Sequence, residues 1–224
     1  SLRAWQTVFD PSSRVGEALL NSILLGVLVS LLSIVVGLPA ARALALHSFR
    51  GKAIVEWLLL IPIIAPSIVV TMGIHIAFIH YRLTDSYLGV MLVHLIPCIP
   101  YMVLVMTGVF ANYGTDLEDT ARTLGAGALR TFVHVTLPAI FPGLLVATMF
   151  TFLISWSQYV TTLLIGGGRI VTLPIVLFPF ISGANNAVAA AISLVFVAPA
   201  IVLLVFTTRS LASETSVMGG FGKL

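Results

Sequence analysis

The chain has 224 residues, of which 59% are hydrophobic and only 8% are charged, and its formal net charge is +3 at pH 7. Soluble domains carry roughly 25% charged residues, so this composition excludes an ordinary soluble globule, and the absence of a basic cluster excludes a nucleic-acid-binding surface. With a mean hydropathy of +1.12, the chain is expected to be an all-α polytopic membrane protein whose residues 1–224 form one transmembrane domain.

The N-terminal segment, residues 1–16, is predicted to lie along the membrane surface. Apolar side chains fall on one face of a short helix, at Leu2, Trp5, Val8 and Phe9. Asp10-Pro11 ends this helix, and Arg3 gives it a charged group beside the apolar face. No long apolar core follows a basic start, so the segment does not have the pattern of a signal peptide.

Five later stretches contain no Lys, Arg, Asp or Glu and have about 20 residues or more, enough to cross roughly 30 Å of hydrocarbon. They are Ala18–Ala41, Trp57–Ile79, Leu88–Ala111, Pro138–Val160 and Ala187–Thr208. A charged side chain at the centre of a span costs about 2.5–3.5 kcal/mol on insertion scales, so the gaps in charge are informative. Pro62 and Pro66 in the second span and Pro97 and Pro100 in the third predict kinks, either for packing or as walls of a translocation pathway.

The Lys and Arg residues favour one orientation in the membrane. If the N-terminus lies outside, seven of the eleven are inside: Arg42, Arg50, Lys52, Arg122, Arg130, Arg209 and Lys223. The other four are then outside: Arg3, Arg14, Arg82 and Arg169. The positive-inside rule therefore predicts an outside N-terminus and a cytoplasmic C-terminus.

The stretch from Thr115 to Pro138 is the most polar part of the chain and lies between two spans. Thr115 followed by Glu118 predicts a capping box at the start of a helix, and acids in its first turn suit the helix dipole. Leu117, Ala121, Leu124 and Ala128 form an apolar seam, which Gly125 and Gly127 interrupt. A glycine just past Leu124 predicts a helix end. A second short helix over about Ala128 to Val135 would follow at an angle, outside the bilayer.

This stretch resembles the signature of the permease subunits of ABC importers, which reads Glu-Ala-Ala, three residues, Gly, nine residues, Ile, one residue, Leu-Pro. Here the same spacing is filled by Asp119-Thr120-Ala121, Gly125, Val135 and Leu137-Pro138. Asp119, Thr120 and Val135 depart from the family pattern. Because Asp119 is a shorter acid, Glu118 is an alternative for the contact that the family's Glu makes.

The resemblance implies a type I ABC importer permease fold, with residues 115–137 as the cytoplasmic coupling loop that docks on an ATPase. The implied coupling residues are Leu117, Glu118, Asp119, Ala121, Arg122, Leu124, Gly125, Ala126, Leu137 and Pro138. The implied partners are two ATPase subunits, an identical or homologous second permease, an extracytoplasmic solute-binding protein and the lipid bilayer of a bacterial inner membrane, without nucleic acid. The layout is most similar to the polyamine-type branch, whose members usually begin with one further helix before the position of Ser1.

Two further regions bear on transport. Residues 170–186 are uncharged but contain Pro174 and Pro179, and they are predicted to be a periplasmic or re-entrant segment. Polar groups near the outer part of the fourth span form the predicted substrate-facing patch: Ser155, Ser157, Gln158 and Tyr159. An aromatic interfacial belt with incidental polar residues is the alternative interpretation. Polyamine permeases tend to have acids in this place, so a polycation cannot be assumed.

Motifs for chemistry within this chain are missing from the sequence. The C-terminal Gly219-Gly220-Phe221-Gly222-Lys223 has the wrong spacing for a phosphate-binding loop, so ATP and Mg²⁺ are expected on the partner ATPase. His75 and His80 lack the glutamate of a zinc-protease motif, and Cys98 has no partner cysteine. The sequence therefore predicts no catalytic residue, metal site or bound cofactor.

Three functional hypotheses remain. The favoured one is the membrane subunit of a binding-protein-dependent ABC importer. An ion-coupled secondary transporter would require ionisable groups within the membrane, and the five spans offer only histidines. A membrane enzyme would require the catalytic motifs that the sequence lacks. The substrate itself stays open, and polyamines, thiamine-like cations, phosphonates and iron complexes are all compatible with the sequence.

Overall fold

A computed structural model describes residues 2–183 and 185–220, with side chains described over 4–183 and 185–209. Regular structure in this described part is entirely helical. The elements are α1 (Leu2–Phe9), η1 (Pro11–Ser13), α2 (Val15–Leu46), α3 (Lys52–Ile64), α4 (Ser67–His80), α5 (Tyr87–Tyr113), α6 (Asp116–Thr123), α7 (Ala128–Thr131), η2 (Phe132–Thr136), α8 (Leu137–Trp156), α9 (Val160–Gly166), α10 (Leu173–Ser182) and α11 (Asn186–Gly220).

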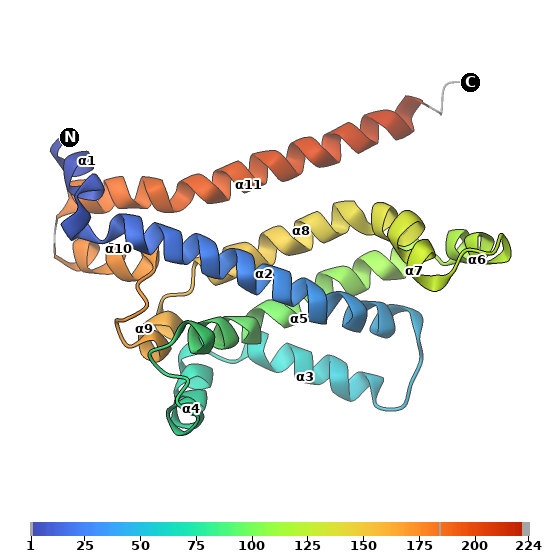
Figure 1. The fold of residues 1–224 in the computed structure, drawn as a ribbon, viewed down its shortest axis with the longest axis horizontal. Helices are drawn as coiled ribbons and strands as arrows, with labels where there is room; N and C mark the ends of the chain where they lie inside the picture. Colours follow the sequence, from blue (N-terminus) through green and yellow to red (C-terminus); the bar gives the residue numbers. More distant parts are fainter. Residues whose placement is uncertain (1, 184, 221–224) are drawn as a thin grey trace.

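The centre of the molecule is the packing of α2 against α5 and α8 (Figure 1). Small residues allow these helices to approach closely. A Cβ atom added at Gly37 of α2 would lie 2.6 Å from Met102 of α5, and one at Gly143 of α8 would lie 2.4 Å from Val109. Close backbone approach at small residues is how helices pack where lipid offers no hydrophobic driving force. The all-helical architecture predicted from the sequence is confirmed over the residues that the structure describes.

Four of the five predicted spans are long apolar helices, and the second is broken. The long helices run over Val15–Leu46, Tyr87–Tyr113, Ala128–Trp156 and Asn186–Arg209. The predicted span Trp57–Ile79 instead consists of α3 and α4, which meet at an angle of 104°. The break falls at Ala65 and Pro66, where proline disfavours helix in the residue before it. The predicted kink at Pro66 is confirmed, whereas Pro97 and Pro100 lie within the single helix α5.

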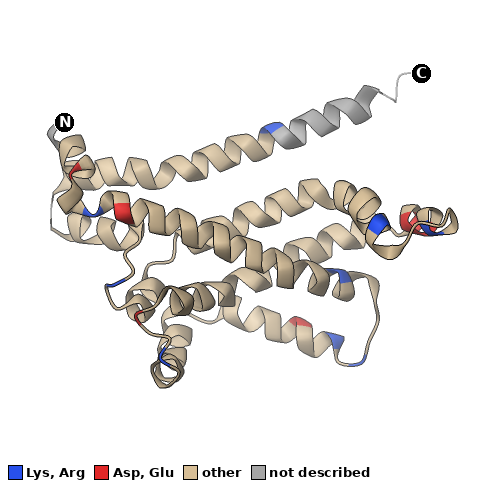
Figure 2. Cartoon of the chain, viewed as in Figure 1, with Lys and Arg blue, Asp and Glu red and all other residues tan. Residues whose placement is uncertain are grey.

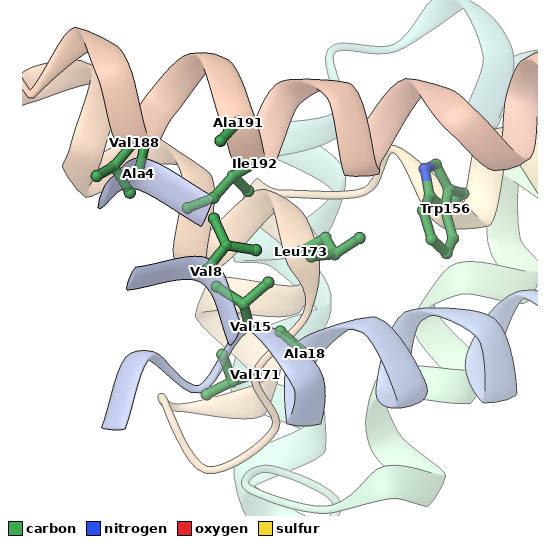
Figure 3. Close-up of a cluster of buried hydrophobic side chains, with 10 residues drawn as sticks. All are labelled: Ala4, Val8, Val15, Ala18, Trp156, Val171, Leu173, Val188, Ala191 and Ile192. Carbon is green, nitrogen blue, oxygen red and sulfur yellow. The ribbon is translucent and has the colours of Figure 1, made fainter. Parts of the chain in front are cut away.

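At one end of the bundle, called the α1 end, α1, α10 and α11 surround the start of α2 (Figure 3). Ala4 and Val8 of α1 are buried in this cluster, while Phe9 is 77% exposed, so the predicted apolar face of α1 is shared between the protein and its surroundings. The cluster consists of Ala4, Val8, Val15, Ala18, Trp156, Val171, Leu173, Val188, Ala191 and Ile192. The assignment of residues 1–16 to the membrane surface stays a prediction.

The segment before α10 is tied to α2 by hydrogen bonds. Asn21 Nδ2 donates to the carbonyl of Val171 at 2.8 Å, and the amide of Leu173 donates to Ser22 Oγ at 2.9 Å. These bonds give partners to backbone groups in an uncharged loop, as a backbone held near a membrane requires. They are compatible with either the periplasmic or the re-entrant assignment of residues 170–186, which stays a prediction.

Most charged residues lie toward the two ends of the bundle (Figure 2), and the central stretches of α2, α5 and α8 contain no charged residue. The end opposite to α1, called the α6 end, contains α6 together with the loop between α2 and α3 (Figure 1). The described part of α11 runs toward the same end. Lys223 lies outside the described residues. This separation agrees with the sorting of Lys and Arg that the sequence predicted.

Candidate functional site: the loop at the α6 end

The first helix of the polar loop, α6, has the bounds that the sequence predicted. Asp116, Glu118 and Asp119 lie in its first turn and Arg122 in its last, which suits the helix dipole at both ends. The predicted capping box is wrong, because the side chain of Thr115 makes no cap hydrogen bond. The carboxylate of Glu118 points to other partners, described below.

Gly125 ends α6 as predicted. Its φ of +84° is in the left-handed region, which glycine adopts without a Cβ penalty. The amide of Gly125 donates to the carbonyl of Arg122 at 2.9 Å, and the amide of Ala126 donates to that of Ala121 at 3.0 Å. This pair of bonds is a Schellman motif, so the turn after α6 has a fixed geometry.

The apolar seam of the loop faces away from the rest of the chain. The exposed fraction is 63% for Leu117 and 84% for Leu124, Ala128 is exposed and Ala121 is half-buried. Leu129, which is not part of this seam, is 77% exposed. Asp119 is exposed beside them. Large apolar side chains that protrude beside charged ones are typical of a surface that a partner covers.

Glu118 is buried within this otherwise exposed helix. Its residue is 2% exposed, and its carboxylate accepts two hydrogen bonds from Arg42 of α2, Nη1 to Oε1 at 2.9 Å and Nη2 to Oε2 at 2.6 Å. Thr136 of η2 donates from Oγ1 to Oε1 at 2.7 Å. Arg122 Nη2 lies 3.9 Å from Oε2. The bonds from Arg42 are the main cause that lowers the pKa of Glu118, so the carboxylate is ionised at neutral pH.

The second helix of the loop differs from the prediction. α7, η2 and α8 form one continuous apolar helical run over Ala128–Trp156, so the expected separate helix is the beginning of the fourth span. η2 is a π-helical turn, in which the amide of Leu137 donates to the carbonyl of Phe132. Pro138 is in the first turn of α8, as expected. A π-helical turn and a proline are both common sites of bending within a helix.

The structure separates the four predicted pathway residues. Ser155 is buried, with its Oγ 2.9 Å from Nδ1 of His94. Ser157 donates to the carbonyl of Ile154 at 3.1 Å. Gln158 Oε1 accepts from Thr161, and the Tyr159 ring stacks on Phe178 at a centroid distance of 4.7 Å. Ser155 lies in the last turn of α8, whereas Ser157, Gln158 and Tyr159 form the turn between α8 and α9, and their role in transport stays a prediction.

His94 is a buried polar contact that joins three helices. Its exposed fraction is 1%, and Nε2 lies 2.9 Å from Oγ1 of Thr162 in α9. With Ser155 on Nδ1, both ring nitrogens have hydroxyl partners. The ring connects α5 to α8 and α9.

The sequence does not identify Arg42 and Thr136 as residues of this site. In the sequence, Arg42 contributes only to the predicted orientation of the chain, and Thr136 is only the variable residue between Val135 and Leu137-Pro138. The one signal in the sequence was an arginine directly after an uncharged span, because a guanidinium there needs either water or a carboxylate partner.

The chain matches the family described as binding-protein-dependent transport system inner membrane component over residues 33–213, which include the whole polar loop. Among its relatives, the molybdate/tungstate transport system permease of Pyrococcus abyssi is 35% identical, over 62% of this chain and 55% of that protein. The alignment thus spans little more than half of that relative. The molybdenum transport system permease of Escherichia coli is 32% identical, over 66% and 70% of the two chains.

The molybdenum transport system permease of Mycobacterium tuberculosis is 29% identical over 95% of this chain and 86% of that protein. These three relatives are named for molybdenum or tungsten, not for polyamines, so they do not support the polyamine-type branch that the layout suggested.

Two solved structures share the fold. The inward-facing methionine ABC transporter MetNI has a TM-score of 0.66 at 15% identity, over 88% of this chain and 94% of that chain. A bacterial ABC transporter for the acidic polysaccharide alginate has a TM-score of 0.71 at 17% identity, over 92% and 78%. Fold, loop and family match agree, and this chain belongs to the family of inner membrane components of binding-protein-dependent transport systems, the multi-pass permeases of ABC importers.

Proposed function

We propose that this chain is the permease subunit of an importer for a small tetrahedral oxyanion of the molybdate and tungstate class. A soluble binding protein outside the membrane would deliver the anion, and ATP hydrolysis on a partner ATPase would drive its import. The proposed coupling to an ATPase is supported mainly by the exposed apolar surface at α6. Leu117 and Leu124 protrude there, although Glu118 of the same segment is bound to α2. An uncovered leucine at 84% exposure favours a protein partner.

The coupling contact would use the exposed face of α6 and the turn after it. Leu117, Asp119 and Leu124 are the side chains that a groove on the ATPase would cover, and Gly125 with Ala126 sets the angle of the turn. Glu118 differs from these, because its carboxylate is already engaged within the chain. Leu137 and Pro138 lie at the start of α8 and would transmit movement, not touch the ATPase.

The importer would contain two ATPase subunits, which hold ATP and Mg²⁺, and a second permease subunit, identical or homologous. The α6 end would lie in the cytoplasm and the α1 end outside, which makes the C-terminus cytoplasmic. Closure of the ATPases would move the α6 loops and tilt the helices, so that the pathway between the two permeases opens alternately to each side.

The substrate class rests on relatives and on charge. The relatives named for molybdate and molybdenum belong to several organisms. The five uncharged stretches of the sequence contain no Asp or Glu. A polycation moving through the membrane would need acidic partners, whereas a dianion would be repelled by them. The amide Nε2 group of Gln158 suits an oxyanion, which accepts hydrogen bonds, because the contact with Thr161 uses only Oε1 of this side chain.

The proposal is tested by reconstituting the permease with its ATPase and binding protein in liposomes and measuring uptake of molybdate with and without internal ATP. Leu124→Asp should abolish association with the ATPase and lower uptake at least tenfold, because it places a charge in an apolar contact. Phe9→Asp is the matched control, since Phe9 is equally prominent, at 77% exposed, but lies at the α1 end.

Three outcomes would contradict the proposal. Uptake that needs an ion gradient but not ATP would favour the secondary transporter. ATP-dependent uptake of a polyamine but not of molybdate would overturn the substrate class. Leu124→Asp with unchanged ATPase association would remove α6 from the coupling contact.

A further inference from the structure

We propose that Arg42, Glu118 and Thr136, together called the latch, form the joint through which movement of α6 passes to α2 and to the start of α8. Arg42 is then a positioning residue for energy coupling. This inference rests on the proposed function, because it presumes that an ATPase moves α6.

The latch reaches from the loop to the centre of the bundle. The α6 backbone packs against α7 and η2, its neighbours along the chain. Arg42 extends this contact to α2, a helix 76 residues away in sequence, and its guanidinium also lies over the ring of Phe110 in α5 at 5.8 Å. The latch thereby connects the loop to α2 and α5, two of the three helices at the centre of the bundle.

The ion pair between Arg42 and Glu118 is both strong and directional. Glu118 has a side chain only 3% exposed, and both of its oxygens receive hydrogen bonds from the planar guanidinium fork. A bidentate pair fixes the angle between its partners as well as their distance. A buried carboxylate that loses its cation is strongly unfavourable. When α6 is pulled or rotated, we therefore expect α2 to move with it before the Arg42–Glu118 pair separates.

Thr136 attaches the latch to the beginning of α8. It is the last residue of the π-helical turn η2, directly before Leu137-Pro138. A π-helical turn inside a helix often marks a functional site, and the missing amide of Pro138 weakens the helix there. Because Thr136 Oγ1 donates to the same carboxylate that binds Arg42, the latch holds α6 to the point where the fourth span can bend most easily.

The test measures molecules of molybdate imported per ATP hydrolysed, in the liposomes described above. Arg42→Gln removes the cation and should lower this ratio about tenfold, as couplings between sites typically do. Association with the ATPase should persist, since Leu117 and Leu124 are untouched. Arg42→Lys keeps the charge without the fork and should give an intermediate ratio. Arg14→Gln is the matched control, because Arg14 makes a bidentate contact of the same kind with Glu17 at the α1 end, where its side chain is 49% exposed, and it should leave the ratio unchanged.

A second variant separates the loss of the joint from a general loss of folding. In Arg42→Cys/Glu118→Cys, a short bis-methanethiosulfonate linker should restore the ratio, whereas capping each thiol with a monofunctional reagent should not. The native Cys98 is buried and is replaced by Ser in both samples.

The outcomes distinguish the two proposals. A wild-type complex that imports molybdate with ATP, while Arg42→Gln imports with the same ratio, overturns the latch and leaves the proposed function intact. Failure of the linker to restore the ratio would also overturn it. A wild-type complex without ATP-dependent import contradicts the proposed function itself.

Discussion

Two arginine–glutamate pairs of the same bidentate kind lie at opposite ends of the molecule. Arg14 and Glu17 at the α1 end are three residues apart, their side chains are about half exposed, and the shorter N–O distance is 2.9 Å. Arg42 and Glu118 at the α6 end are 76 residues apart, and the glutamate side chain is 3% exposed. Of these two pairs, only the second joins distant parts of the chain and holds its carboxylate away from water, while the Arg42 side chain is 25% exposed. The structural role of these ion pairs therefore depends on the burial of the carboxylate and on the separation of the two residues in sequence, and not on the N–O distance.

The surroundings of the two pairs reinforce this difference. The α1 end is held by apolar packing spread over several helices, which Figure 3 shows around Val8, Val15 and Leu173. The loop at the α6 end exposes its leucines and is fastened by a few directional polar bonds. Packing that is spread over many residues tolerates single changes better than a joint made of one carboxylate.

The largest expected effect is that of Glu118→Ala. It leaves Arg42 without a carboxylate and removes the acceptor of Thr136, so the free energy of unfolding should fall by about 3 kcal/mol. Thermal unfolding of the protein in nanodiscs measures the loss. A decrease below about 1 kcal/mol would place the buried pair in the same class as an exposed one.

Thr136→Val tests the third member of the latch at nearly constant side-chain volume. It removes the hydroxyl that donates to Glu118 and should cost about 1 kcal/mol. Thr123→Val is the control, because the Thr123 hydroxyl bonds only to the carbonyl of Thr120 among the described contacts, on the exposed side of α6. Equal losses for the two variants would contradict a special role for Thr136.

The pH dependence of stability offers a weaker contrast. Hydrogen bonds from Arg42 lower the folded-state pKa of Glu118, so the pair stabilises the fold fully above the unfolded pKa of a glutamate, about 4.3. This stabilisation is lost as the pH falls through the lower folded value. The difference in unfolding temperature between wild type and Glu118→Gln should therefore be constant near neutral pH and shrink in acid. A difference that is independent of pH down to acid unfolding would show that the carboxylate charge is not what matters.

The smallest expected effect is that of Glu17→Ala at the α1 end. Its partner Arg14 stays hydrated, so the free energy of unfolding should change by less than about 0.5 kcal/mol. The same nanodisc measurement applies. A loss as large as that of Glu118→Ala would erase the contrast between the two ends.

Local rules in the sequence predicted much of the loop. Acids in the first turn and Gly125 after Leu124 gave the bounds of α6, because both act through neighbouring backbone groups. The predicted capping box did not form, because the carboxylate of Glu118 binds Arg42 instead. Arg42 is distant in sequence, and no local spacing rule pairs it with Glu118.

Two other differences have tertiary causes. The break between α3 and α4 was expected as a kink at Pro66, but no local rule sets its angle of 104°, and α4 packs against α9, which is distant in sequence. The patch expected around Ser155 followed from adjacency in sequence, whereas helix packing turned Ser155 inward to His94. Periodicity reveals which residues share a face, and only the packed structure decides what that face meets.

The most direct test of the joint is a distance between α2 and α6 during the ATPase cycle. Spin labels at the exposed positions Ala43 and Thr123, in the assembled importer with Cys98→Ser, report this distance by pulsed electron resonance. The latch predicts one narrow distance distribution with and without nucleotide, and a broad one in Arg42→Gln. A wild-type distance that shifts with nucleotide would show that α6 moves independently of α2 and would contradict the joint.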